Sequence, residues 1–301
     1  MRASLARALL VSCVLTMAAG CTSSGHRRWS PLGALENSAV FQPAPYSEGN
    51  WQPEGLDFED VWFTAADGTQ LHGWYCPHPS PRAAVLFAHG NAGNLSHRAE
   101  LLRLLHDHLG VAVMAFDYRG YGRSTGSPDE WGILQDARAA RAWLASRLQI
   151  AESDVVLMGR SLGGGVMVDL AAADGARGLI LESTFTSLPE AAAEMAPWLP
   201  ARLLMQNRLD SLSKIAHYHG PLLQSHGDAD RVIPFEQGRR LFAAAPDRPG
   251  CRPKRFITIP GGDHNDPQTP DYYQALDEFL ANLPPPTRWS APVAENVDRR
   301  R

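Results

Sequence analysis

The chain alternates, from about residue 58 to residue 282, between short apolar runs and longer segments with apolar residues at helical spacing. Residues 83–88 form a continuous apolar run, which is typical of a strand buried on both faces of a sheet. Strand-like segments at residues 61–63 and 71–75 flank the turn Asp67-Gly68 and predict a β-hairpin. Further strands are predicted at residues 111–116, 178–181, 221–225 and 255–259, and one more ends just before Ser161. Helices are predicted at residues 98–108, 130–148, 234–245 and 270–282, and one more begins just after Ser161.

Strands and helices that alternate along a chain form a mostly parallel sheet with helices on both faces. The predicted fold class is therefore α/β, with one domain over residues 51–283. Residues 184–219 separate two predicted strands and are too long for a simple connection. They predict a small insertion of short helices with an apolar face, formed by Met195, Pro197, Trp198, Leu199, Pro200, Leu203, Leu204 and Met205.

The start of the chain has the pattern of a secretory signal peptide. Arg2 and Arg7 provide a basic start, and an apolar run follows at residues 8–19. This run is too short to cross a bilayer comfortably. We therefore predict that residues 1–20 are a signal peptide and not a transmembrane helix.

The residues Ala18-Ala19-Gly20-Cys21 resemble the bacterial lipobox, in which the cysteine is lipidated and becomes the new N-terminus. This resemblance implies a protein of the bacterial cell envelope that is anchored by lipid at Cys21, and Thr22 in place of aspartate favours the outer membrane over the inner one. The alternative is an ordinary signal peptide with a chance cysteine. Residues 21–50 are predicted to be a tether, and residues 284–301 a disordered tail.

Charge and cysteine content restrict the function less than the motifs do. The net charge of −4 and the absence of a basic stripe argue against a nucleic-acid partner. Once the signal and Cys21 are set aside, only Cys76 and Cys251 remain, and the sequence leaves open whether they form a disulfide.

The segment Gly159-Arg160-Ser161-Leu162-Gly163 stands between a predicted strand and a predicted helix. This context is typical of a nucleophile elbow, in which a serine on a strained turn exposes its hydroxyl and the next helix directs N–H groups at an oxyanion. A second match to the same pattern, residues 122–126, lies past the end of its strand and runs into the turn signal Gly126-Ser127-Pro128. We predict that Ser161 is the nucleophile and Ser124 a loop serine.

A serine nucleophile needs a base, and the base needs an acid that orients it. His264 follows the last predicted strand in a glycine-containing loop and is the candidate base. Asp230 follows the preceding strand and is the candidate acid, in the chain order serine, acid, histidine. The alternatives are Asp228, which we expect to cap a turn, and Glu182, which ends an earlier strand.

An oxyanion hole needs two N–H donors. One is expected from Leu162, the residue after the predicted nucleophile. The other is expected from Asn91, in the loop after the strand at residues 83–88, where Gly90 allows the backbone to come close. The side chains of Asn91 and Asn94 are alternatively braces for this loop.

Neither a metal nor a cofactor is predicted. His226, Asp228 and His264 have no spacing of a known metal-ligand motif. The glycines at positions 159 and 163–165 do not precede the acidic residue that a dinucleotide site requires.

Several of these motifs occur together in one order: His89-Gly90-Asn91-Ala92-Gly93-Asn94, residues 117–124, the turn at Ser161, His226-Gly227 with Asp230, and residues 262–266. Together they resemble the α/β-hydrolase superfamily over residues 58–283, and most closely its branch of α/β-hydrolase-domain and serine-aminopeptidase-type proteins. The resemblance implies that Ser161 attacks an acyl carbonyl, His264 transfers the proton, Asp230 orients His264, and water releases the acyl-enzyme. It also implies a structural loop at residues 117–124 and a cap over the active site at about residues 184–219.

The predicted function is a serine hydrolase that cleaves carboxylic esters, with thioesters and acyl lipids included, and its partners are a small ester or acyl substrate and the membrane. A peptidase or amidase shares the same three residues and remains an alternative. An alternative of another class is an envelope lipoprotein that binds without catalysis, although such a protein has no need of serine, acid and base together. A dehalogenase would need aspartate in place of Ser161. The apolar cap residues predict an acyl pocket or, alternatively, a seal over the core.

Overall fold

The computed structural model describes residues 31–198, 200–247 and 253–287 of the chain. The predicted signal peptide, Cys21 and residues 288–301 of the predicted tail lie outside the described residues. The chain divides into two units, Met1–Ala34 and Leu35–Arg301, and everything that follows concerns the second. Within the described segments, no helix has both the length and the apolar character needed to cross a membrane.

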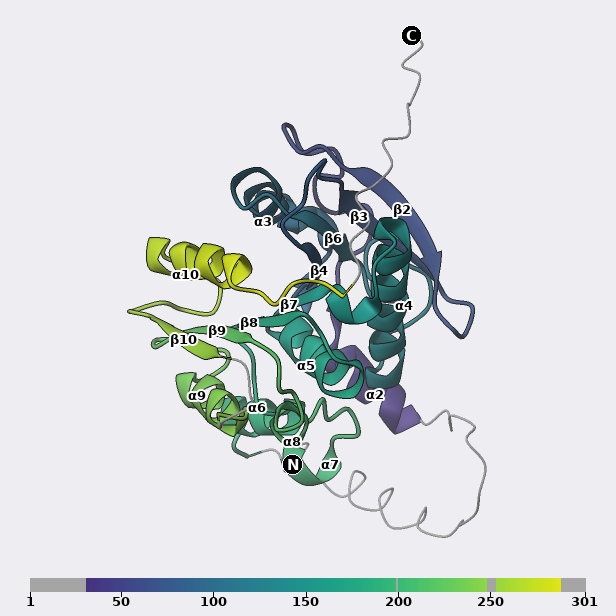
Figure 1. Cartoon of the computed structure of the whole chain (residues 1–301). Helices are drawn as coiled ribbons and strands as arrows, with labels where there is room; N and C mark the ends of the chain where they lie inside the picture. Colours follow the sequence, from purple (N-terminus) through teal and green to yellow (C-terminus); the bar gives the residue numbers. More distant parts are fainter. Residues whose placement is uncertain (1–30, 199, 248–252, 288–301) are drawn as a thin grey trace, which may run out of the picture. The chain divides into compact units, whose positions relative to one another are not determined.

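The second unit is built on an eight-stranded sheet with the order β10-β9-β8-β7-β4-β6-β3-β2 (Figure 1). Strand β3 is antiparallel to both of its neighbours, and all other neighbours are parallel, which confirms the α/β prediction and the hairpin. The strands are β2 (Glu59–Thr64), β3 (Gln70–Cys76), β4 (Ala84–Ala88), β6 (Ala112–Phe116), β7 (Val156–Arg160), β8 (Gly178–Glu182), β9 (Leu222–Gly227) and β10 (Lys254–Ile259).

Helices cover both faces of this sheet (Figure 1). One face packs against α4 (Glu130–Leu148), α5 (Leu162–Asp174), α8 (Ser211–Ile215) and α9 (Phe235–Ala244). The other face packs against α3 (Ala99–Arg103) and α10 (Pro270–Ala281). The helix expected at residues 98–108 is divided into three short pieces. The 3₁₀ turn Leu95–Arg98 comes first, α3 follows it, and the π-helical turn Leu104–His108 comes last.

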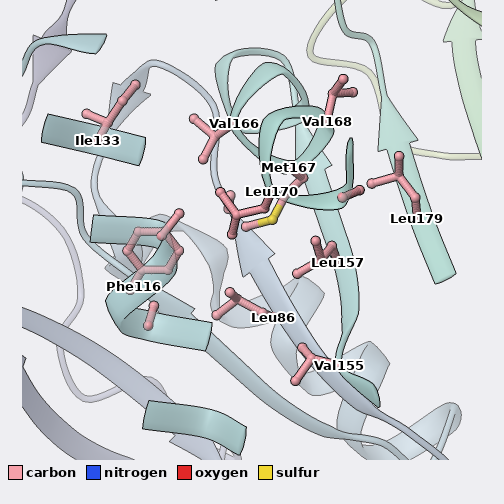
Figure 2. Packing of buried hydrophobic residues seen from close by; sticks show 14 of the residues in the cluster. Leu86, Phe116, Ile133, Val155, Leu157, Val166, Met167, Val168, Leu170 and Leu179 are labelled. Atoms are coloured by element: carbon pink, nitrogen blue, oxygen red, sulfur yellow. The ribbon is translucent and has the colours of Figure 1, made fainter. Parts of the chain in front are cut away.

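Side chains of the central strands alternate between two apolar cores. In β4, Leu86 belongs to the core under α4 and α5, whereas Val85 and Phe87 belong to the core under α3 and α10. Figure 2 shows Met167 and Leu170 of α5 lying over Leu86 and its surroundings. This two-sided burial explains the continuous apolar run in the sequence, because every side chain of β4 is inside.

The prediction of a tether extending to residue 50 is wrong for residues 35–50. Helix α2 (Pro31–Val40) leads into the buried Phe41 and the short strand β1 (Gln42–Pro43). Strand β1 pairs in parallel with β5 (Ala92–Gly93), so this polar segment is fixed on the domain by backbone hydrogen bonds that its composition does not reveal.

The tail prediction is wrong for residues 284–287. The backbone N–H and the hydroxyl of Thr287 donate to the carboxylate of the buried Asp154, at 2.9 Å and 2.7 Å. Arg177 donates from Nε to the carbonyl oxygen of Pro284 at 2.9 Å. These contacts extend the ordered domain a few residues past the proline run.

The insertion between β8 and β9 contains three short helices, as the sequence predicts. They are α6 (Leu188–Met195), α7 (Ala201–Leu204) and α8. Four of its large apolar side chains point to solvent, with exposed fractions of 63% for Met195, 83% for Trp198, 86% for Leu203 and 61% for Leu204. These four side chains are therefore not buried in the core. Leu199 lies outside the described residues.

Candidate active site

Ser161 lies on a strained turn between β7 and α5, with φ of +52° and ψ of −117°. Such a conformation is rare for a residue with a side chain and is kept only where the surroundings enforce it. A Cβ atom at Gly159 would lie 2.3 Å from the carbonyl oxygen of Gly163, and one at Gly163 would lie 2.0 Å from that of Ala88. Both flanking positions therefore require glycine, which gives the turn the geometry of a nucleophile elbow.

Two hydrogen bonds hold this turn from the next strand. The Ser161 N–H donates to the carbonyl oxygen of Glu182 at 2.8 Å. The hydroxyl of Thr184 donates to the carbonyl oxygen of Ser161, also at 2.8 Å. The end of β8 thus stabilises the unfavourable backbone conformation of Ser161.

The structure brings the three residues Ser161, His264 and Asp230 together. His264 lies in the loop between β10 and α10, with Nε2 3.1 Å from Ser161 Oγ. Its Nδ1 lies 2.8 Å from Oδ2 of Asp230, which comes from the loop after β9. A carboxylate can only accept, so Nδ1 carries a proton, and Nε2 of the neutral ring is then free to accept the serine hydroxyl proton.

The loop around Asp230 keeps its side chain ionised and aimed at His264. Its Oδ1 accepts the backbone N–H groups of Val232 and Ile233 at 2.9 Å and 2.8 Å. Burial would raise the pKa of this carboxyl, but hydrogen bonds from His226 and His264 outweigh burial and hold the pKa below its ordinary value. His226, to which the sequence assigned no role in the catalytic group, is buried with Nε2 2.8 Å from the carbonyl oxygen of Ile233.

The two other candidate acids have different partners. Asp228 accepts the N–H of Gly261 at 2.6 Å, which links the loop after β9 to the turn that precedes His264. Glu182 is buried and accepts the hydroxyl of Tyr272 at 2.5 Å, and burial raises the pKa of its carboxyl. Asp228, which was expected to cap a turn, therefore binds the backbone of a turn, and Glu182 contacts Tyr272 of α10.

The loop predicted to supply an oxyanion donor lies against Ser161, because a Cβ atom on Gly90 would be 3.5 Å from the Cβ of Ser161. The side chain of Asn91 braces this loop. Its Nδ2 donates to the carbonyl oxygen of Val40 at 2.6 Å, and its Oδ1 accepts the hydroxyl of Tyr121 at 2.8 Å and the N–H of Gln42 at 3.1 Å. The segment predicted to be a tether therefore positions the backbone beside the predicted nucleophile.

Leu162, the other predicted donor, is the first residue of α5. The first N–H groups of a helix have no acceptor within the helix, and the helix dipole adds positive charge at this end. The N–H of Leu162 is thus suited to bind a developing negative charge next to Ser161.

Sequence reasoning missed Arg160, the residue before Ser161. Its Nη2 donates to the backbone carbonyl oxygen of His264 at 2.6 Å. Arg160 also lines a cavity of about 300 Å³ together with Glu100, Leu101, Arg103, Leu104, His108, Glu182, Pro267, Gln268 and Tyr273. The elbow pattern allows any residue before the serine, so the sequence gives no indication of this contact.

Ser124 in the second copy of the elbow pattern has a structural environment. Its hydroxyl donates to the carbonyl oxygen of Asp117 at 2.7 Å and accepts the N–H of His72 at 3.0 Å. In the same loop, the buried Arg119 forms an ion pair with the buried Asp136, with Nη2 2.8 Å from Oδ1. This loop is held by its own contacts, as the resemblance implied.

Cys76 is a buried free thiol, and burial raises its pKa to about 12. Cys251 lies outside the described residues. In the segments that the structure describes, no three His, Cys, Asp or Glu side chains are grouped so as to hold a metal ion.

The family of this chain follows from comparisons with known proteins. The family model of serine aminopeptidase, S33, matches residues 79–217. An uncharacterized protein of Mycobacterium tuberculosis is 43% identical over 251 residues, which cover 83% of this chain and 86% of that protein. The α/β-hydrolase domain-containing protein WAV2 of Arabidopsis thaliana is 34% identical over 254 residues, covering 77% of this chain and 82% of WAV2.

Among solved structures, the esterase Pf2001 of Pyrococcus furiosus has the same fold, with a TM-score of 0.63 and 20% identity over 80% of this chain and 99% of that one. The fold and the site define the class as that of the α/β-hydrolases. The chain belongs to the α/β-hydrolase superfamily.

Proposed function

We propose that this protein is a serine hydrolase that cleaves carboxylic esters through an acyl-enzyme. The observation that carries the proposal is the continuous path from Ser161 Oγ to His264 Nε2, at 3.1 Å, and from His264 Nδ1 to Asp230 Oδ2, at 2.8 Å. Ser161 is presented on a strained turn at the start of a helix, where its hydroxyl is accessible to a substrate carbonyl.

In the proposed reaction, Ser161 Oγ attacks the carbonyl carbon while its proton passes to His264 Nε2. The N–H groups of Leu162 and Asn91 stabilise the oxyanion of the tetrahedral intermediate. The intermediate collapses, and the alcohol leaves with the proton from Nε2. Water then gives a proton to Nε2 and attacks the acyl-serine. When the bond between the acyl carbon and Ser161 Oγ breaks, the acid leaves and Nε2 returns the proton to Oγ, which regenerates Ser161.

A peptidase or amidase is the second candidate, and the match to the serine aminopeptidase family favours it. Removal of residues from a free N-terminus calls for a group that binds the substrate ammonium. Asp230, which contacts His264, and Glu182, whose backbone binds the N–H of Ser161, have buried carboxylates that already accept hydrogen bonds. This supports an ester in preference to an aminoacyl substrate.

The test is labelling of the purified protein with a fluorophosphonate probe, together with turnover of p-nitrophenyl esters and aminoacyl amides. We expect wild-type labelling and ester turnover, and loss of both in Ser161→Ala. Ser124→Ala is the matched control, because it removes the serine of the same pattern at a site held by structural contacts, and it should keep labelling. Amide turnover that exceeds ester turnover would favour the peptidase, and folded wild-type protein without labelling would favour a non-catalytic lipoprotein.

We further propose that Cys21 carries a lipid that anchors the protein in the bacterial envelope, in the outer membrane. The lipobox-like residues before Cys21 support this proposal. Cells that express the chain should incorporate radioactive palmitate into it, and Cys21→Ser should abolish the incorporation. Cys13→Ser, a change within the signal, is the control that should retain it. Label that persists in Cys21→Ser contradicts the proposal.

A further inference from the structure

We propose that the outer face of the insertion docks on a lipid bilayer and delivers membrane-embedded acyl esters to Ser161. This cap face consists of Met195, Trp198, Leu203 and Leu204, whose large apolar side chains are all mostly exposed. The inference deepens the proposed function and rests on it.

The cap face spans α6 and α7, which pack against each other. Met195 ends α6, Trp198 lies in the segment between the two helices, and Leu203 and Leu204 belong to α7. Exposed apolar residues that occur singly are normal, but a group on adjoining elements marks an interaction surface. Arg202 stands beside Leu203 in α7, and its side chain is 61% exposed while Nε pairs with Glu190 Oε1 at 2.7 Å. Leucine, tryptophan and arginine on neighbouring positions suit the boundary between acyl chains and headgroups, where apolar side chains insert and the cation stays at the surface.

The attachment of the N-terminal segment lies next to the cap face. The carboxylate of Glu36 accepts the backbone N–H groups of Gln206 and Asn207 at 2.9 Å and 2.7 Å, directly after α7. Asn207 also donates from Nδ2 to Asn37 Oδ1 at 2.8 Å. The start of the second unit at Leu35 is therefore beside the end of α7.

The proposed anchor supplies the reason why a bilayer, and not another partner, covers the cap face. Ten residues lead from Cys21 to Pro31, where α2 begins, and they span at most about 36 Å when fully extended. A lipid on Cys21 would hold the start of the domain near the membrane. This start lies beside the end of α7, next to the exposed Leu203 and Leu204.

The cap face is also connected to the segment that holds the turn at Ser161. The insertion begins at Thr184, whose hydroxyl donates to the carbonyl oxygen of Ser161. Phe185, the next residue, packs against α5, since a Cβ atom on Gly165 would lie 3.1 Å from its ring. The docked surface is thus connected through a short buried segment to the elbow, and esters in the bilayer are the substrate class that this placement favours.

The test is co-sedimentation of the mature chain, residues 21–301, with vesicles of phosphatidylethanolamine and phosphatidylglycerol. Cys21→Ser removes the lipid, so any binding comes from the protein surface. We expect the chain to bind, and we expect the partition coefficient to fall at least about tenfold in Leu203→Glu/Leu204→Glu, because two apolar side chains no longer enter the bilayer. Trp198→Gln should weaken binding, whereas Trp62→Gln, at an exposed tryptophan of β2, should not.

The readouts separate this inference from the proposed function. Fluorophosphonate labelling and turnover of a water-soluble ester should be the same in the cap-face variants and the wild type. Hydrolysis of an ester embedded in the vesicles should fall with the partition coefficient. Binding without turnover of any ester would overturn the proposed function alone. Turnover without vesicle binding, binding equal in all variants, or a dimer that dissociates in Leu203→Glu/Leu204→Glu would overturn the docking proposal.

Discussion

The guanidinium of Arg160 is bound to the backbone of His264, with Nη2 2.6 Å from the carbonyl oxygen. This contact joins the turn that carries Ser161 to the loop that carries the predicted base. Arg160→Met removes the donor, and we expect kcat for ester turnover to fall up to about 100-fold, because a small misplacement of a reacting group has an effect of this size. Since Arg160 acts through His264, KM should change much less than kcat.

The control is Arg103→Gln, since Arg103 lines the same cavity but donates to the carbonyl oxygens of Glu54 and Gly55. It should leave kcat within about twofold of wild type. Arg160→Lys keeps one donor and should restore part of the lost kcat. An Arg160→Met enzyme that changes only KM would assign Arg160 to substrate binding instead of positioning.

The glycine after Leu162 should be intolerant of substitution. A Cβ atom at position 163 would lie 2.0 Å from the carbonyl oxygen of Ala88, and backbone cannot move aside as a flexible side chain can. We expect Gly163→Ala to lower the free energy of unfolding by about 3 kcal/mol, the upper part of the range for overpacking. Urea denaturation measures this difference.

Gly165→Ala is the matched control in the same helix. Its Cβ atom would meet side chains alone, the ring of Phe185 at 3.1 Å and the hydroxyl of Ser211 at 3.4 Å, and these can shift slightly. Alanine is also favoured over glycine in helices by about 1 kcal/mol. The free energy of unfolding should therefore stay within about 1 kcal/mol of wild type, and equal losses in the two variants would refute the steric argument.

Asp230 should contribute to both activity and acid stability. Asp230→Asn leaves the ring of His264 without its orienting carboxylate, and kcat should fall about 10⁴-fold. The pKa of Asp230 is below its ordinary value of 3.8, so the carboxylate stabilises the folded state above that pH and loses this contribution as the pH falls toward the lowered pKa. The difference in unfolding free energy between wild type and Asp230→Asn should shrink as the pH falls below about 4.

The same measurement on Asp228→Asn distinguishes the two loop aspartates. The carboxylate of Asp228 binds the N–H of Gly261, and within the described part of the chain it has no hydrogen bond or ion pair with His264, so kcat should fall far less than in Asp230→Asn. A larger loss of kcat in Asp228→Asn would show that Asp228, and not Asp230, orients the histidine.

The buried pair of Arg119 and Asp136 should matter for stability. Both side chains are almost fully buried, and Arg119→Met would leave the carboxylate of Asp136 without its cation. We expect a loss of about 3–5 kcal/mol in the free energy of unfolding. The exposed pair of Arg147 and Glu59 is the control, and Arg147→Met should cost less than about 1 kcal/mol.

Much of the fold was predictable because its signals are local. Apolar runs such as residues 84–88 and the helical spacing after Ser161 depend on neighbouring residues alone. The glycines at 159 and 163 were readable for the same reason, since the turn they permit spans a few residues. The carboxyl ends of parallel strands lie at one edge of a sheet, so the sequence also indicated that Ser161, Asp230 and His264 would be close.

Contacts between distant residues were not predictable. Val40 and Gln42 lie 51 and 49 positions before Asn91, in a segment whose composition suggested a tether, and only the fold shows that this segment braces the loop beside Ser161. Thr287 and Asp154 are a second example, at the end predicted to be a disordered tail.

The sequence by itself determined the α/β class, the insertion after β8 and the set of candidate side chains, because periodicity and glycine spacing act over short stretches. Tertiary structure decided which of Asp230 and Asp228 turns toward His264, since that depends on which backbone N–H groups each carboxylate accepts. It also decided that Leu203 and Leu204 face outward, because an apolar pattern shows that a face exists but not whether the protein itself covers it.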